Sequence, residues 1–212
     1  MKSFVNILKI IAVVIFSIIL WNFLYEKPLS VKIGNDNILN DGDLLFVKGT
    51  TLRSRIVNFL NTNEKEYSHV GILRIINNTP FIIHSSPNNN FNNNHDVISK
   101  QKLNEFFKFN KVTNVTIYRL QSNFINIPTK ASLFAESYLN RSVLFDHDFN
   151  LDNDNKLYCT ELIWCAYKKA GIDLIKNNFD ILNTPIVKGR AIFPSTLSNS
   201  KYLSEIISIR YK

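Results

Sequence analysis

An apolar run near the N-terminus is the feature that most constrains this chain. Residues 4–25 carry a single charged side chain, and about 20 apolar residues are enough to cross a bilayer as a helix. Trp21 and Tyr25 stand at the far end of the run, where interfacial aromatic side chains are expected. We therefore predict one N-terminal transmembrane anchor, residues 1–27, followed by a single domain, residues 28–212.

Two alternatives to an uncleaved anchor remain open. A cleaved signal peptide would use Lys2 and Lys9 as its basic region, but the segment that follows, WNFLYEKPLSVKIG, has no A-x-A cleavage pattern. A buried core helix is the third possibility. The short N-terminal side favours an N-inside orientation, which predicts a membrane-anchored, single-pass protein whose domain is extracytoplasmic.

Composition excludes several classes of protein. The chain has 212 residues, 45% of them hydrophobic and 20% charged, which excludes a wholly disordered or collagen-like protein. The formal net charge is +8, yet the Lys and Arg residues are scattered and form no basic helix face interleaved with aromatic residues. We therefore expect no nucleic-acid partner. Anionic lipid headgroups are a more natural partner for a basic domain tethered to a membrane.

The pattern of the remaining chain predicts an α+β domain with a mainly antiparallel sheet. Strands are expected at Leu44–Lys48, His69–Ile76, Pro80–His84 and Val115–Leu120. Helices are expected at Leu52–Leu60, Leu103–Phe107, Lys130–Asn140 and Thr160–Ala170, the last ending at Gly171.

Two histidines are expected to meet at one end of a predicted hairpin. His69 begins the first strand, His84 ends the second, and Asn77-Asn78-Thr79 forms the turn. A tight hairpin places the start of one strand beside the end of the other. One imidazole there can act as a base while a second polar group orients it.

Cys159 is the candidate nucleophile. It stands at the start of the predicted helix Thr160–Ala170, where the positive end of the helix dipole is expected to lower its pKa and favour the reactive thiolate. The competing interpretation is a small buried hydrophobic residue. Cys165 lies well inside the same helix, so we expect it to serve in core packing. A disulfide between the two is implausible, because six helical residues separate Cα atoms by about 9 Å.

An acidic loop precedes Cys159. Counted from Asn150, oxygen ligands fall at positions 1, 3 and 5 and Glu161 falls at 12, which is the spacing of a calcium loop. Position 1 is Asn, and position 6 is Asn155 where such loops have Gly. We therefore favour a turn-rich loop with Asx capping and expect no metal and no cofactor. His147 lies in this loop as a surface residue or a substrate contact.

Several blocks of sequence, taken together, resemble the permuted papain-like amidases, the YiiX/YaeF-like branch of the NlpC-type cysteine peptidase superfamily. The matching stretches are GDLLF at 42–46, SHVGI at 68–72, IHSS at 83–86, FDHDFNLDNDNKLYCTEL at 145–162 and IFPS at 192–195. The resemblance implies a circularly permuted papain-like domain, in which the cysteine helix packs on an antiparallel sheet and the histidine precedes the cysteine in the chain.

The resemblance also implies roles for individual residues. His69 of SHVGI matches the general base and Cys159 of YCTEL matches the nucleophile. His84 matches the third, polar position, which is often Glu in YiiX-like sequences and is a second His in the related lecithin retinol acyltransferase type. Flanking the two motifs, Tyr158, Ser68 and Glu161 are candidates for oxyanion or substrate contacts.

Three functions are compatible with these residues. The first is a membrane-anchored cysteine amidase or peptidase that acts through an acyl-enzyme on cell-wall peptide or another amide. The second is a thiol acyltransferase or lipase acting on membrane lipids, which the anchor, the positive charge and the two histidines favour. The third is a non-catalytic papain-like module that binds a peptide or an acylated ligand. Fold resemblance raises the expectation of hydrolysis but does not choose the bond.

Overall fold

The computed structural model describes residues 13–15, 17, 38–49, 67–87, 98–110, 112–153, 155–183 and 188–210. Most of the predicted anchor and the whole predicted helix Leu52–Leu60 lie outside these residues. Within the described ranges, no helix is both long enough and apolar enough to span a membrane. The division of the chain at residue 27 therefore stays a prediction.

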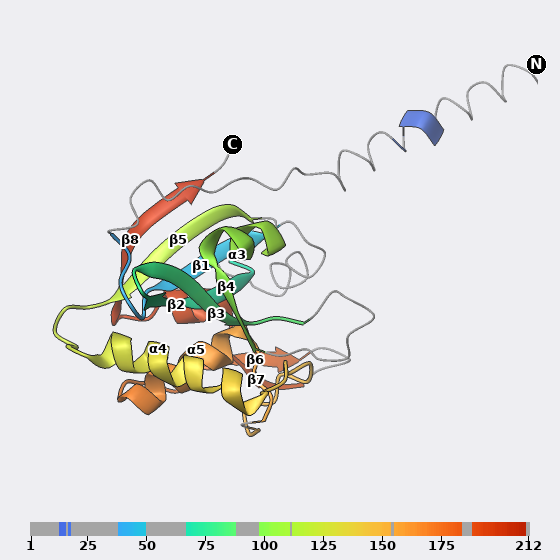
Figure 1. Cartoon of the computed structure of the whole chain (residues 1–212). Helices are drawn as coiled ribbons and strands as arrows, with labels where there is room; N and C mark the ends of the chain where they lie inside the picture. Colours follow the sequence, from blue (N-terminus) through green and yellow to red (C-terminus); the bar gives the residue numbers. More distant parts are fainter. Residues whose placement is uncertain are drawn as a thin grey trace, which may run out of the picture.

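A six-stranded sheet forms the centre of the domain (Figure 1). Its strands are β1 (Leu44–Gly49), β2 (His69–Ile76), β3 (Thr79–Ser85), β4 (Ile98–Lys102), β5 (Val112–Leu120) and β8 (Leu203–Arg210). They lie in the order β4-β3-β2-β1-β5-β8. All neighbouring strands pair antiparallel, which confirms the predicted α+β class with an antiparallel sheet.

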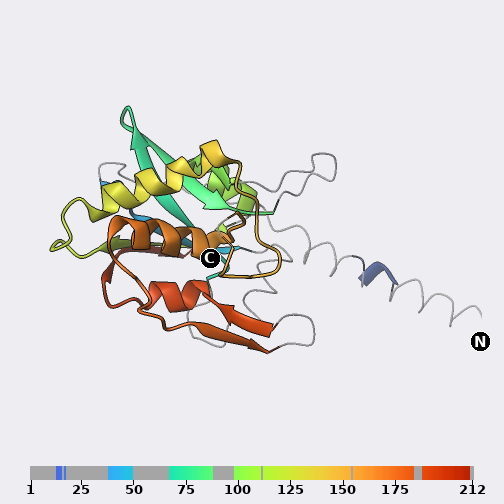
Figure 2. The ribbon, with the colours of Figure 1, turned by 90° about the horizontal axis from the view of Figure 1, so that it is seen from below.

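Helices cover both faces of the sheet. Those in the described ranges are α3 (Leu103–Asn110), α4 (Ile127–Ser137), η2 (Leu139–Arg141), α5 (Cys159–Ala170) and α6 (Pro194–Ser198). Figure 2 shows α4 and α5 side by side across one face. A small hairpin of β6 (Asp180–Asn183) and β7 (Lys188–Ala191) stands apart from the main sheet.

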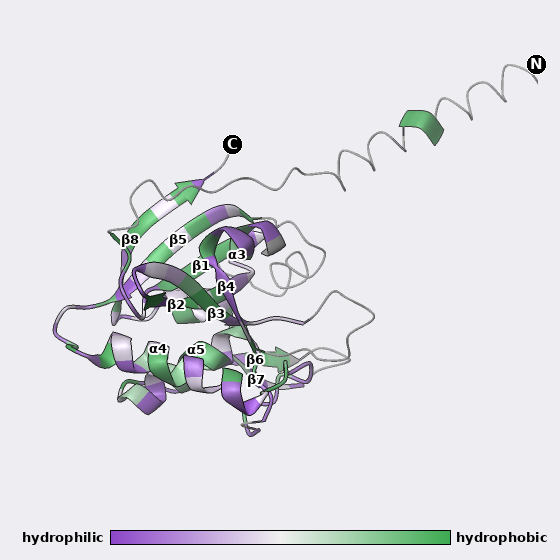
Figure 3. Ribbon diagram, in the orientation of Figure 1, coloured by the Kyte–Doolittle hydropathy of each residue, from purple (hydrophilic) through white to green (hydrophobic). Residues whose placement is uncertain are grey.

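Alternating side chains of the central strands supply two separate cores. Leu44, Phe46 and Val70 face α4 and α5, whereas Leu45 and Val47 face Phe106 and Phe107 of α3. Successive side chains of a strand point to opposite faces, so a strand covered on both sides is apolar along its length. Figure 3 shows β1 and β5 as predominantly hydrophobic ribbons. This is why the run LLFV at 44–47 shows no alternation of polar and apolar residues.

The predicted strands are confirmed with small changes at their ends, but both edge strands were missed. β4 reads ISKQK, and β8 exposes most of its residues. An edge strand needs little apolar sequence because solvent reaches one side of it. The predicted helix Lys130–Asn140 begins earlier, at Ile127, because Pro128 occupies the first turn, where a missing N–H costs nothing. Helix α5 ends at Gly171 as expected.

Candidate active site

The β2–β3 hairpin brings His69 and His84 together. Its turn residues, Asn77 and Asn78, have φ angles of 49° and 60°, and asparagine tolerates this left-handed conformation well. The resulting register places Nε2 of His69 3.0 Å from Nδ1 of His84. The prediction that the two imidazoles lie at one end of the hairpin is confirmed.

Both imidazoles are packed inside the domain on the α3 side of the sheet. His69 is 9% exposed and His84 is 1% exposed. The ring of Phe106 stacks on His69 and meets His84 edge to face. Gly71 allows this close packing, because a Cβ there would lie 2.3 Å from Cγ2 of Ile82 and 3.4 Å from Cβ of His84. The glycine of SHVGI is therefore needed for the approach of β3 to β2.

Burial keeps both histidines neutral at physiological pH. Removal from water disfavours the imidazolium, and it lowers the pKa of His84 to about 4, with a smaller opposing effect from the side chain of Gln101. The pKa of His69 falls well below its usual value, first through burial and then through the neighbouring His84. A neutral imidazole can accept a proton, as a base must, but the lowered pKa makes His69 a weaker base than a free imidazole.

Acid is expected to destabilise the fold through this pair. Below pH 6.5 the unfolded chain binds protons that the folded chain excludes, so the free energy of unfolding falls as the pH falls. For His84, whose folded pKa is about 4, the loss between pH 7 and pH 4 is about 3 kcal/mol. Urea denaturation of the wild type and of His84→Gln measures it.

The two proteins are expected to diverge only in acid. Between pH 7 and pH 8 their stabilities should run parallel, which serves as the internal control, and below pH 6.5 the variant should lose stability less steeply. Equal slopes of stability against pH from 6.5 to 4 in both proteins would contradict a buried, neutral His84.

Cys159 occupies the first position of α5, after the N-cap residue Tyr158. The pairing of β2 with β3 ends at Ile72 and Ile83. Past this last pair, the backbone N–H of Val70 in β2 donates a hydrogen bond to the thiol of Cys159. The nucleophile is thus placed beside the residue that follows His69. Among the described residues no hydrogen bond joins the thiol to either imidazole, and such catalytic contacts often tighten only when substrate binds.

The expected lowering of the pKa of Cys159 is wrong. Burial raises the pKa of this thiol to about 11, and the backbone N–H groups of Val70, Thr160 and Cys159 itself oppose the rise only in part. The helix start does point N–H groups at the sulfur, as predicted, but their stabilisation of a thiolate is smaller than the cost of desolvation. The raised pKa therefore favours the neutral thiol over the thiolate.

The second cysteine behaves as predicted. Cys165 packs, partly buried, against the core cluster on the α5 side of the sheet. Both cysteines are free thiols. Because Cys159 packs against the same cluster, packing does not separate the two. The backbone N–H groups of Val70, Thr160 and Cys159 itself, which lie at its sulfur, distinguish Cys159.

The three candidates for oxyanion or substrate contacts make structural hydrogen bonds around the site. The hydroxyl of Tyr158 accepts a hydrogen bond from the backbone N–H of Ile192 at 2.9 Å. Ser68 accepts from the N–H of Gly49 at 2.9 Å, which ties β2 to β1. Glu161 accepts from the N–H of Tyr158 at 3.3 Å, as an N3 carboxylate does in a capping box. This placement gives each a structural role and lends no support to an oxyanion role for Tyr158.

The acidic loop before Cys159 is organised by Asx turns. The carboxylate of Asp146 accepts from the N–H groups of Asp148 and Asn150, at 2.9 and 2.5 Å, and Asn150 accepts from Asp152 at 3.0 Å. His147 is exposed and packs against Phe145. In the part of the chain that the structure describes, no group of three or more His, Cys, Asp or Glu side chains is arranged to hold a metal ion.

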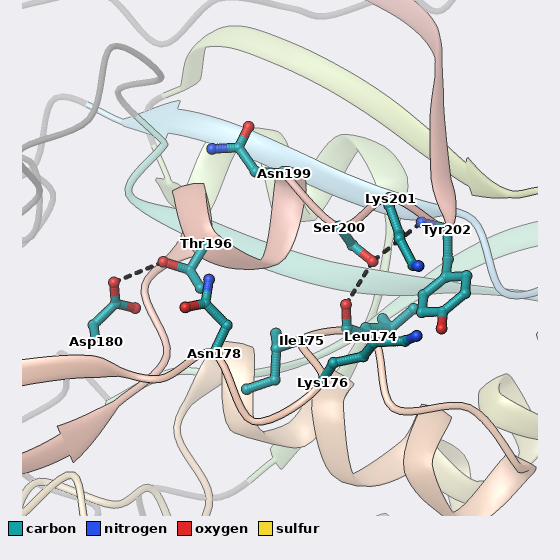
Figure 4. Close-up of a pocket in the computed structure, with 10 residues that line it drawn as sticks. All are labelled: Leu174, Ile175, Lys176, Asn178, Asp180, Thr196, Asn199, Ser200, Lys201 and Tyr202. Atoms are coloured by element: carbon teal, nitrogen blue, oxygen red, sulfur yellow. Dashed lines mark hydrogen bonds between the residues drawn. The ribbon is translucent and has the colours of Figure 1, made fainter.

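A cavity of about 450 Å³ lies away from these residues. It is lined by the segment after α5 and the turn between α6 and β8, and Figure 4 shows Lys176 and Lys201 beside the ring of Tyr202. Cys159, His69 and His84 are absent from its described lining. Polar side chains such as Asp180 and Thr196 are already hydrogen-bonded to each other across it. This cavity does not serve the candidate nucleophile.

Comparison with known proteins agrees with the fold. Residues 38–202 match the family described as "Permuted papain-like amidase enzyme, YaeF/YiiX, C92 family". No curated protein matches the chain. Among solved structures, the fold is similar to that of the metalloprotein yiiX from Escherichia coli O157:H7, with a TM-score of 0.62 and 18% identity over 81% of this chain and 98% of that one.

Proposed function

The chain belongs to the permuted papain-like amidase family, and from this we propose that the domain is a cysteine hydrolase that cleaves an amide through an acyl-enzyme on Cys159. The observation that carries the proposal is the hydrogen bond between His69 and His84 at the strand end where the Cys159 thiol rests on Val70 N–H. A nucleophile, a base and a group that orients the base form the working set of such enzymes.

The resting charges favour general-base catalysis. Since burial raises the pKa of Cys159 to about 11 and keeps His69 neutral, a stored thiolate–imidazolium pair is disfavoured. Nε2 of His69 is bound to His84, so Nδ1 is the ring nitrogen that would take the thiol proton. His84 holds the ring in position through this step.

In the remaining steps of the reaction, His69 carries the proton between Cys159, the leaving amine and water. Sulfur attacks the carbonyl carbon as its proton moves to His69, and the oxyanion is stabilised by backbone N–H groups at the start of α5, including that of Cys159. His69 then protonates the leaving amine as the C–N bond breaks. Water attacks the thioester, gives a proton to His69, and the thiol regains that proton when the C–S bond breaks.

Tethered by the apolar segment 4–25, the domain would meet its substrate at a membrane surface.

Trapping the acyl-enzyme tests the proposal. The full chain, in detergent, would be mixed with p-nitrophenyl acetate at pH 7 and quenched for mass spectrometry of its peptides. We expect an acetyl group on Cys159, released with time. His69→Ala should slow acetylation by about 10²-fold or more, because the thiol then has no base.

Cys165→Ala is the matched control, since it removes the other thiol of the same helix and should leave acetylation unchanged. Acetylation of Cys165 in place of Cys159, or equal rates in the wild type and His69→Ala, would refute the proposal.

A further inference from the structure

Two polar side chains from the edge strand β4 lie next to His84. Register pairs His84 with Ser99 and Ile82 with Gln101. Alternate residues of a strand share a face, and diagonal neighbours on that face are within reach of long side chains. Ser99 and Gln101 therefore both lie on the face that carries the two imidazoles.

Each ring nitrogen of His84 has a hydrogen-bond partner. Nδ1 of His84 meets Nε2 of His69 at 3.0 Å, and Nε2 of His84 meets Oγ of Ser99 at 3.1 Å. The Oε1 atom of Gln101 is buried and, among the described residues, has no hydrogen bond of normal geometry. The Gln101 side chain is nonetheless close enough to oppose the fall in the pKa of His84. Two oxygens are thus placed to accept one ring proton.

The position of that proton decides whether His69 can act as a base. A neutral imidazole carries one proton, on either nitrogen. With the proton on Nε2 of His84, its Nδ1 accepts from Nε2–H of His69, and Nδ1 of His69 is left bare to take the thiol proton. With the proton on Nδ1 of His84, it donates to His69 instead. The proton of His69 then lies on Nδ1, where it blocks transfer from the thiol.

We propose that Ser99 and Gln101 are positioning residues that hold His84 in its Nε2–H form and thereby fix His69 as an acceptor toward Cys159. The inference rests on the proposed function. It extends the proposed set of Cys159, His69 and His84 by two residues of β4, Ser99 and Gln101, which we call the β4 pair. Oγ of Ser99 is the direct acceptor, and Oε1 of Gln101 is the second. A hydroxyl can also donate, so Ser99 alone permits either proton position, whereas a carboxamide oxygen accepts only.

The test reads the proton positions directly. Protein labelled with ¹⁵N-histidine would be studied by NMR at pH 7, where each neutral tautomer has its own pair of ring-nitrogen shifts. We expect His84 and His69 to be Nε2–H in the wild type. In the double variant Ser99→Ala/Gln101→Met, both rings should become mixtures. Lys102→Ala, an exposed change on the same strand, is the control and should leave the spectrum unchanged.

Kinetics on any ester or amide that the protein hydrolyses provide the second readout. The double variant should lose at least about tenfold in kcat with KM within about twofold, because the wrong tautomer removes the base and leaves substrate contacts intact. The single variant Ser99→Ala, which keeps the acceptor-only oxygen of Gln101, should retain most of the wild-type kcat.

Failure of this inference is distinguishable from failure of the proposed function. His84 found as Nδ1–H in the wild type, or tautomers unchanged in the folded double variant, would overturn the positioning role whatever the activity. Tautomers that shift as expected in a protein that is never acylated at Cys159 would uphold the role of the β4 pair and overturn the hydrolase.

Discussion

Replacing Cys159 with alanine is expected to lower kcat/KM toward an amide substrate by about 10⁴-fold or more, because the covalent route through the thiol is lost. The measurement is steady-state hydrolysis of the best substrate from a panel of peptide and acyl amides.

The matched comparison uses the second thiol. Cys165→Ala removes a packing contact from the same helix and is expected to keep kcat/KM within about twofold of the wild type. Cys159→Ala should unfold within a few degrees of the wild type, which excludes misfolding as the cause. Retained hydrolysis in a folded Cys159→Ala protein would mean that the domain does not use this nucleophile.

Replacing Gly42 with alanine is expected to cost about 2–4 kcal/mol of folding stability. Gly42 has a φ of +83°, and a Cβ there would lie 2.4 Å from the carbonyl oxygen of Pro128 and 2.5 Å from its Cβ. Its N–H donates to Leu73 and its carbonyl accepts from the hydroxyl of Tyr167. Gly42 therefore lies between the sheet, α4 and α5, and its backbone cannot shift to relieve the clash without breaking these hydrogen bonds.

A second glycine distinguishes the cost of backbone strain from the cost of a steric clash. Gly189 also has a positive φ, 150°, but nothing lies within 4 Å of the position of an added Cβ. Gly189→Ala is thus expected to show only the backbone cost, about 1 kcal/mol, and thermal or urea unfolding of the two variants compares them directly. Equal losses at the two positions would contradict the packing role given to Gly42.

Local sequence was enough to predict the parts of the site that depend on neighbouring residues. Asn77-Asn78 determines the turn, the turn determines the hairpin, and the hairpin brings His69 to His84. The helix start at Cys159 was likewise readable from the pattern after it. These features follow from backbone preferences and periodicity over short stretches, which a single sequence carries.

Tertiary structure decided what depends on segments far apart in the chain. The dipole argument alone predicts a low pKa for Cys159, but packing of α5 against the sheet buries the thiol and reverses the direction. Ser99 and Gln101 stand in ISKQK, an edge strand with no apolar pattern, so only its pairing with β3 shows that they reach His84. The sequence by itself determined which groups are candidates for the chemistry. Burial and strand pairing, which arise from contacts between distant segments, decided their charge states and what holds them in place.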